Sequence, residues 1–129
     1  MIRGYFQRVE GLLSKCPLAI NFQYNFTVVD VSRGFWKGSV EFRRGFELHL
    51  FEYVVVERGV QKIDSYRYHF QDFEGELVFR SDNAPHHPEL ESHPHHLHQS
   101  GTVSSTMPQP ELEAVLDKAI RKIQSNNAI

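Results

Sequence analysis

The chain has 129 residues, of which 40% are hydrophobic and 12% aromatic, and this composition predicts one domain around one packed core. The formal net charge of −2 at pH 7 excludes general attraction of the whole molecule to nucleic acid, so any nucleic-acid contact requires a local patch. The single cysteine, Cys16, excludes an internal disulfide, which is typical of proteins in a reducing cytoplasm.

The first expected element is an amphipathic helix over residues 1–15. Its apolar side chains recur at the spacing of one helix face, and they are Tyr5, Phe6, Val9, Leu12 and Leu13. The helix is expected to end near Cys16, because Pro17 disfavours helical backbone in the residue before it. Arg8, Glu10 and Lys15 interrupt the apolar stretch that a signal peptide would need, and no apolar run approaches the roughly 20 residues of a membrane span. We therefore expect a cytoplasmic protein without membrane contact.

Residues 20–80 are expected to form an antiparallel sheet. Aromatic and aliphatic residues alternate with polar ones here, which is the pattern of strands with one buried face. The alternating sets are Phe22, Tyr24, Phe26 and Val28; Trp36, Val40 and Phe42; Phe46, Leu48 and Leu50; Tyr66, Tyr68 and Phe70; and Leu77 and Phe79. Turn signals lie between them at Gly34, Gly45, Gly59 and Gly75. Short connections between about five strands predict a meander.

The last part of the chain is expected to be a long loop followed by a helix. Residues 81–109 show no periodicity and contain several prolines, so we predict a histidine-rich loop there. A helical stripe predicts a second helix over residues 110–124, and its members are Leu112, Val115, Leu116, Ala119, Ile120 and Ile123. The expected fold is α+β: a single domain with one meander sheet of about five strands, both helices on one face, and the loop.

The strand register predicts which side chains share a face, because directly opposed residues of an antiparallel pair point to the same side. Pairing Leu48 with Phe70 makes the apolar faces coincide and requires an odd-numbered loop at Arg58 and Gly59. Pairing Phe70 with Leu77 requires a two-residue turn at Phe73 and Glu74. The opposite, polar face then carries Glu47, His49, Arg67, His69 and Arg80.

The segment after Asp82 concentrates the histidines of the chain. Those between positions 86 and 98 are His86, His87, His93, His95, His96 and His98. One interpretation is a solvated polar loop without chemistry. A second is a divalent transition-metal site for Zn²⁺, Ni²⁺ or Cu²⁺ at His95, His96 and His98, with Asp82 or His86 completing the ligand set. The HExxH and CxxC motifs that would mark a zinc site are absent.

A third interpretation is acid–base chemistry on an RNA phosphodiester without any cofactor. This reaction needs a base for the 2′-hydroxyl, an acid for the leaving oxygen, and cations for the phosphoryl charge. The candidate catalytic residues are His69, Arg80, Asp82, His86, His87, His95 and His96, and the candidate substrate-binding residues are Arg67, Asn83 and His98. In this set the guanidiniums hold the phosphate, and Asp82 fixes the tautomer of a histidine. His49 is interpreted as a structural residue.

Two segments resemble the TumE-like toxin family. They are Tyr66–Asp72 and the run Leu77–Leu90, and the match continues through Pro94–His98 and the helix near Pro110. The resemblance implies the toxin of a prokaryotic type II toxin–antitoxin pair, bound by a cognate antitoxin with a helix-turn-helix. Three hypotheses follow: a toxin that cuts or binds RNA, a metal-binding module, and a non-catalytic interaction protein. The expected edge strand near Phe22–Val28 offers a surface for a homodimer or for the antitoxin.

Overall fold

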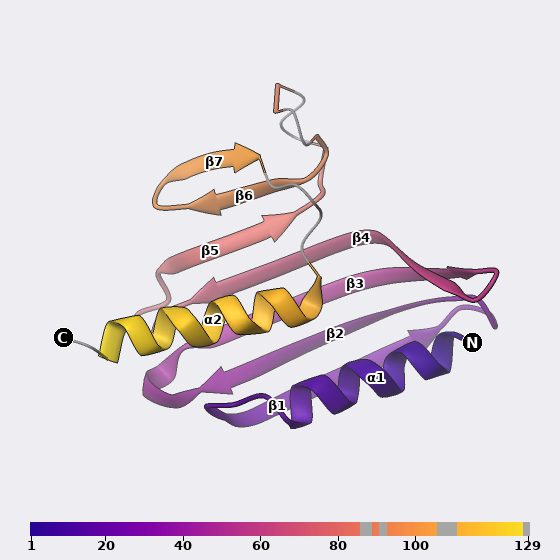
Figure 1. The fold of residues 1–129 in the computed structure, drawn as a ribbon, viewed down its shortest axis with the longest axis horizontal. Helices are drawn as coiled ribbons and strands as arrows, with labels where there is room; N and C mark the ends of the chain where they lie inside the picture. Colours follow the sequence, from indigo (N-terminus) through magenta and orange to yellow (C-terminus); the bar gives the residue numbers. More distant parts are fainter. Residues whose placement is uncertain (86–88, 91–92, 106–110, 128–129) are drawn as a thin grey trace.

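The computed structural model has an α+β fold in which a helix at each end of the chain packs on one antiparallel sheet of seven strands (Figure 1). It describes residues 1–85, 89–90, 93–105 and 111–127. The elements are α1 (Ile2–Ser14), β1 (Ala19–Val28), β2 (Arg33–Phe42), the short 3₁₀ helix η1 (Arg43–Gly45), β3 (Glu47–Glu57), β4 (Val60–Gln71), β5 (Leu77–Asp82), β6 (His96–Gln99), β7 (Thr102–Ser105) and α2 (Leu112–Asn127). The strands lie in chain order, β1 to β7, so the sheet is a meander as predicted.

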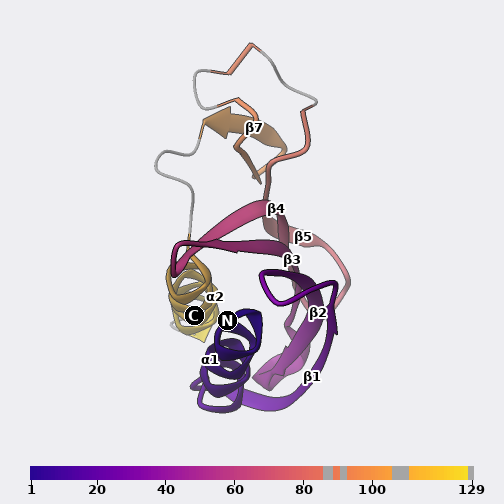
Figure 2. The same cartoon turned by 90° about the vertical axis from the view of Figure 1, so that its right-hand side faces the viewer.

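Both helices cover the same side of the sheet, and the sheet curls around them (Figure 2). The apolar stripe of α1 buries Ile2, Phe6 and Leu13 against the sheet, as its helical spacing predicts. Gly34 permits this close approach, because a Cβ there would lie 2.9 Å from the ring of Phe6. The aromatic core between helices and sheet includes Trp36, which is fully buried. We call the side of the sheet opposite the helices the open face.

A buried carboxylate lies inside this apolar core. Glu52 is 1% exposed and accepts hydrogen bonds from the Tyr5 hydroxyl, from Trp36 Nε1 at 2.8 Å and from the Tyr68 hydroxyl at 2.5 Å. Burial raises the pKa of the Glu52 carboxyl, although the three hydrogen bonds act in the opposite direction. Burial also raises the pKa of both phenols, which therefore remain donors. This cluster joins α1 to β2, β3 and β4.

The β3–β4 hairpin has the predicted register but a different turn. Leu48 lies opposite Phe70, as expected. The loop, however, has two residues, Arg58 and Gly59, with φ of 51° and 76°, the left-handed values that a tight hairpin turn requires. Tyr53 pairs with Ser65 and Val54 pairs with Ile63, so Asp64 between them is one additional residue in β4, a β-bulge. The prediction of an odd-numbered loop was wrong because the bulge supplies the odd residue.

The predicted β4–β5 register was wrong by two residues. Phe70 lies opposite Phe79 rather than Leu77, and a bulge follows that pair. The predicted register would have set Arg80 opposite Arg67, two like charges on neighbouring strands, whereas the observed register sets Asp82 opposite Arg67. The turn comprises residues 72–76 rather than two residues. The Asp72 side chain stabilises it by accepting hydrogen bonds from the backbone N–H groups of Glu74 and Glu76. The shift by two keeps Phe79 and Arg80 on their predicted faces but changes every neighbour of β5. The prediction of Leu77 on the apolar face was wrong, because the bulge sets it opposite Gln71, where it is 43% exposed.

The expected loop over residues 81–109 contains two further strands, so the sheet has seven strands rather than about five. β5 continues to Asp82, and β6 and β7 form a hairpin whose turn is Ser100 and Gly101, with φ of 55° and 76°. The prediction missed these strands because they carry few apolar residues and therefore no alternation. Among the described residues, neither helix has the length and apolar content needed to cross a membrane.

Candidate functional site

A row of polar side chains crosses four neighbouring strands on the open face. His49 on β3 lies opposite His69 on β4, His69 lies opposite Arg80 on β5, and Arg80 lies opposite His98 on β6. Directly opposed residues point to the same side of a sheet, so the guanidinium of Arg80 has an imidazole on each flank. The backbones of His69 and His98 are two strand spacings apart, about 10 Å.

His69 is held in a defined position in this row. Its Nε2 lies 3.1 Å from Oε1 of Gln71, and its ring lies 6.2 Å from the ring of His49. Burial lowers the pKa of His69, and the neighbouring charge of Arg80 lowers it further. A lowered pKa keeps this imidazole neutral, and therefore able to accept a proton, at neutral pH.

Asp82 lies at the end of β5 and organises the residues around it. Its carboxylate is 4% exposed and receives Nε of Arg80 at 3.1 Å, Nε2 of His96 at 2.9 Å and the backbone N–H of Ala84 at 3.0 Å. Three donors compensate a buried carboxylate for the water it has lost. Because the bond from Arg80 uses Nε, the terminal nitrogens of the same guanidinium can still reach a phosphate.

His96 is a positioning residue in this arrangement. It is 2% exposed, its Nδ1 lies 3.0 Å from the carbonyl oxygen of Pro94, and its Nε2 faces Asp82. A carbonyl oxygen only accepts, so Nδ1 donates to Pro94 while Nε2 contacts the carboxylate of Asp82. Both ring nitrogens are thus engaged within the protein, and His96 cannot exchange a proton with a substrate in this conformation.

Two other predicted residues lie away from the row. His95 stacks on Tyr66 with ring centroids 5.7 Å apart, and its Nδ1 lies 2.9 Å from the Tyr66 hydroxyl on the helix side of the sheet. Asn83 binds the backbone of β4, because its Oδ1 accepts from Tyr66 N and its Nδ2 donates to the Asp64 carbonyl. These contacts give Asn83 a structural role. His86 and His87 lie outside the described residues.

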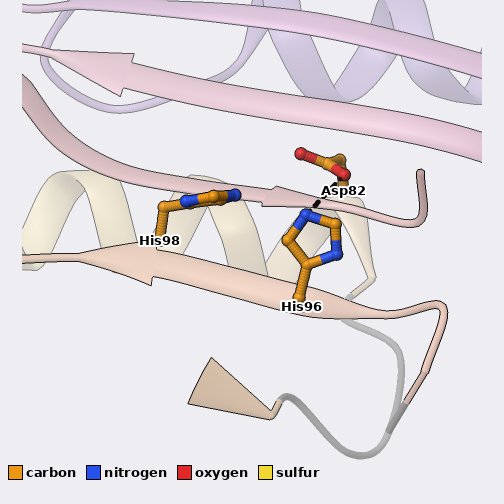
Figure 3. Close-up of side chains that lie close together, drawn as sticks. All are labelled: Asp82, His96 and His98. Carbon is orange, nitrogen blue, oxygen red and sulfur yellow. Dashed lines mark ion pairs between the residues drawn. The ribbon is translucent and has the colours of Figure 1, made fainter. Parts of the chain in front are cut away.

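A group with metal-ligating atoms lies at the same place. The ligand atoms of Asp82, His96 and His98 lie within 4.8 Å of one another, and Figure 3 shows both imidazoles projecting from β6 toward β5. His95 is not a member of this group, so the predicted set of three histidines does not come together. Tetrahedral Zn²⁺ with bonds of about 2.1 Å sets its ligand atoms about 3.4 Å apart. A metal would therefore have to separate Nε2 of His96 from the Asp82 oxygen, which lie 2.9 Å apart.

The sequence analysis missed two residues that line the hollow beside Arg80. This hollow has a volume of about 500 Å³, and Lys37 and Phe51 lie on its walls together with Arg67, Arg80 and Asp82. The alternation of side chains along a strand could have identified Phe51, because residues 49 and 51 point to one face of the sheet and residues 48 and 50 to the other. A second hollow, of about 470 Å³, lies under the helices and reaches the Glu52 cluster.

Comparison with known proteins gives one match. The family model described as Toxin TumE matches residues 9–127, nearly the whole chain, including every residue of the row and of the Asp82 cluster. We found no match to a curated protein sequence or to a solved structure.

Proposed function

The chain belongs to the TumE toxin family, and from this premise we propose that it inhibits growth by cutting RNA in the cytoplasm, with the row around Arg80 as the active site. The observation that carries the proposal is that His69 and His98 flank Arg80 on three adjacent strands of the open face. Two imidazoles and a guanidinium in a row can supply the base, the acid and the phosphate-binding cation that metal-independent cleavage of a phosphodiester needs.

Each residue has a defined role in this reaction. Arg80 binds the phosphate through its terminal nitrogens while Asp82 holds its Nε. His69 accepts the proton of the 2′-hydroxyl, whose oxygen attacks phosphorus, and His98 donates a proton to the departing 5′ oxygen as the P–O bond breaks. The products are a 2′,3′-cyclic phosphate end and a 5′-hydroxyl end. His96 acts through Asp82, as a positioning residue.

Incubation of the purified chain with cellular RNA in EDTA tests this proposal. We expect fragments with 2′,3′-cyclic phosphate ends, and a loss of about 100-fold or more in rate for Arg80→Ala, His69→Ala and His98→Ala. His49→Ala is the matched control, because His49 lies in the same row but does not flank Arg80. Intact RNA under these conditions, or equal losses for His49→Ala and His69→Ala, would contradict the mechanism.

A toxin family implies an antitoxin partner. We propose that the pair is of type II, in which an antitoxin protein with a helix-turn-helix binds the toxin directly. The edge strand β1 carries exposed backbone along one side of the sheet and is the surface proposed for the antitoxin or for a homodimer. Co-purification with the product of the adjacent gene checks the partner, and light scattering of the isolated chain checks the dimer.

A divalent transition metal bound by Asp82, His96 and His98 is the second candidate. The convergence of their ligand atoms within 4.8 Å favours it. Calorimetric titration of the chelated, untagged chain with Zn²⁺ tests it: binding that is lost in His98→Ala and kept in His95→Ala supports a metal site. Equal affinity in the two variants would exclude this ligand set.

A further inference from the structure

The open face carries aromatic side chains that the core does not need. Phe35, Phe51 and Tyr53 are half-buried on the side of the sheet opposite the helices. Phe35 stacks on Tyr53 with ring centroids 6.1 Å apart and planes 15° apart, and it lies 6.4 Å from the ring of Phe51. Apolar rings on a solvent-facing sheet surface commonly mark a binding site rather than a packing site.

Cations border these rings on the sheet. Lys37 lies opposite Phe51 on one side, and Arg67 lies opposite it on the other, so Phe51 stands between two positive charges on neighbouring strands. Both cations are exposed. Arg67 lies opposite Asp82 of β5, the strand that also carries Arg80 of the proposed active site. Positive charge thus follows the sheet from β2 to β5.

The surface is hollowed along the same path. The hollow of about 500 Å³ beside Arg80 shares Lys37, Phe51 and Arg67 with a second hollow of about 260 Å³, so the two are neighbours on this face. A third hollow, of about 150 Å³, lies farther along and is lined by Glu41 and Glu47. No lysine or arginine is among the described residues that line this third hollow, whereas Lys37, Arg67 and Arg80 offset the carboxylates of Asp64 and Asp82 in the first, so the part of the surface suited to a polyanion ends before it.

We propose that this surface binds single-stranded RNA, with a base stacked on Phe51 and the adjoining phosphates held by Lys37 and Arg67, and that it delivers the strand to Arg80. Alternating rings and cations on a sheet match the alternating bases and phosphates of an unpaired strand. A duplex keeps its bases stacked inside, where these rings cannot reach them. The inference rests on the proposed function and adds the class of RNA and the residues that select it.

Binding is measured with the full chain and a fluorescent 2′-O-methyl RNA of about ten nucleotides. The methyl group removes the attacking hydroxyl, so binding is measured without cleavage. We expect Phe51→Leu to weaken binding of the single strand about tenfold, as expected for the loss of stacking on one base. Phe73→Leu is the matched control, because Phe73 is an exposed aromatic residue in the β4–β5 turn, outside this surface.

Two further measurements sharpen the test. Lys37→Ala should lower the slope of log affinity against log salt by about 0.7, the value for one phosphate contact on a single strand. Lys15→Ala, directly after α1, should leave the slope unchanged. The duplex of the same sequence should bind at least about tenfold more weakly than the single strand. The Lys37 comparison also decides the question if Phe51→Leu does not fold.

Equal binding by Phe51→Leu and Phe73→Leu, or equal affinity for duplex and single strand, overturns the inference. A face that binds the antitoxin but no RNA also overturns it. Failure of the proposed function is a different result: natural RNA stays intact while the 2′-O-methyl strand still binds and responds to Phe51→Leu.

Discussion

Two buried carboxylates, one on each side of the sheet, differ in the charge of their donors. Glu52 lies under the helices and accepts hydrogen bonds from two phenols and an indole, all neutral. Asp82 lies at the open face and accepts from a guanidinium, an imidazole and a backbone N–H group. Neutral donors do not offset the desolvation of Glu52, whose pKa burial raises. The comparison indicates that Glu52 joins the helix to the sheet, whereas Asp82 holds Arg80 and His96 of the proposed site in position.

The largest effect is expected on stability, when the buried Glu52 is replaced. Glu52→Ala leaves three buried donors without an acceptor and opens a cavity, so we expect the free energy of unfolding to fall by about 4 kcal/mol. Urea unfolding measures this loss. Glu57→Ala, an exposed carboxylate at the end of the same strand, is the control and should stay within about 0.5 kcal/mol of the natural chain. A loss below about 1 kcal/mol would mean that Glu52 does not hold the core.

The next effect tests the Asp82 side. Asp82→Asn removes the negative charge that holds Arg80 and His96, so we expect RNA cleavage to fall about tenfold to hundredfold while stability falls only about 1–2 kcal/mol. Cleavage rate and urea unfolding are measured on the same preparations. Asp64→Asn is the matched control, because Asp64 is an exposed carboxylate that lines the same hollow. Full cleavage by Asp82→Asn would remove Asp82 from the site.

A third test uses pH to separate the two carboxylates. The pKa of Glu52 in the folded chain is raised above its ordinary value of 4.5, so its contribution to stability is fully present below pH 4.5 and is lost as the pH rises through the raised pKa. Glu52→Gln cannot ionise and should lose this dependence. The urea midpoints of the natural chain and of Glu52→Gln, measured from below pH 4.5 upward, show this pH dependence of stability. A difference between the two proteins that does not change with pH would contradict the raised pKa.

The smallest effect is expected at an exposed ion pair in the β1–β2 turn. Arg33 and the Ser32 N–H hold the Asp30 carboxylate and lower its pKa to about 2, so this interaction is kept until the pH falls below 3.8. Both side chains face solvent, where water and salt screen the pair. We expect Asp30→Ala to cut RNA at the natural rate and to change the thermal midpoint least of all these variants. A midpoint shift as large as that of Asp82→Asn would contradict this order.

The sequence predicted the faces of the sheet better than the neighbours on them. Parity alone places His49, His69 and Arg80 on one side, and the structure agrees. The partner of Arg80 required the exact register of β5, which a bulge sets, and no alternation reveals a bulge. The same parity places Glu52 among Leu48 and Leu50. A carboxylate at a core position was therefore a readable signal that the sequence analysis did not use.

The histidine-rich segment was the least predictable part. β6 and β7 pair with the sheet through backbone hydrogen bonds, which leave no trace in side-chain hydrophobicity. The one local sign was the Ser100–Gly101 dipeptide, a common hairpin turn. Pairing to β5 sets His96 beside Asp82 and His98 beside Arg80. Without that hairpin, the positions of His95, His96 and His98 relative to the row, the core and the possible metal ligands could not be assigned.

The position of β6 in the chain has a consequence for the order in which the proposed site is completed. His98 lies on a strand that is made after the five strands of the first meander, and Lys118 of α2 contacts Gln99 of that strand later still. When only β1 to β5 have been synthesised, the polypeptide contains Arg80 and one of its two flanking imidazoles, that of His69. In the proposed mechanism, RNA cleavage is therefore expected only once the last quarter of the chain is being made, and a stop codon between β5 and β6 is expected to yield a product without His98.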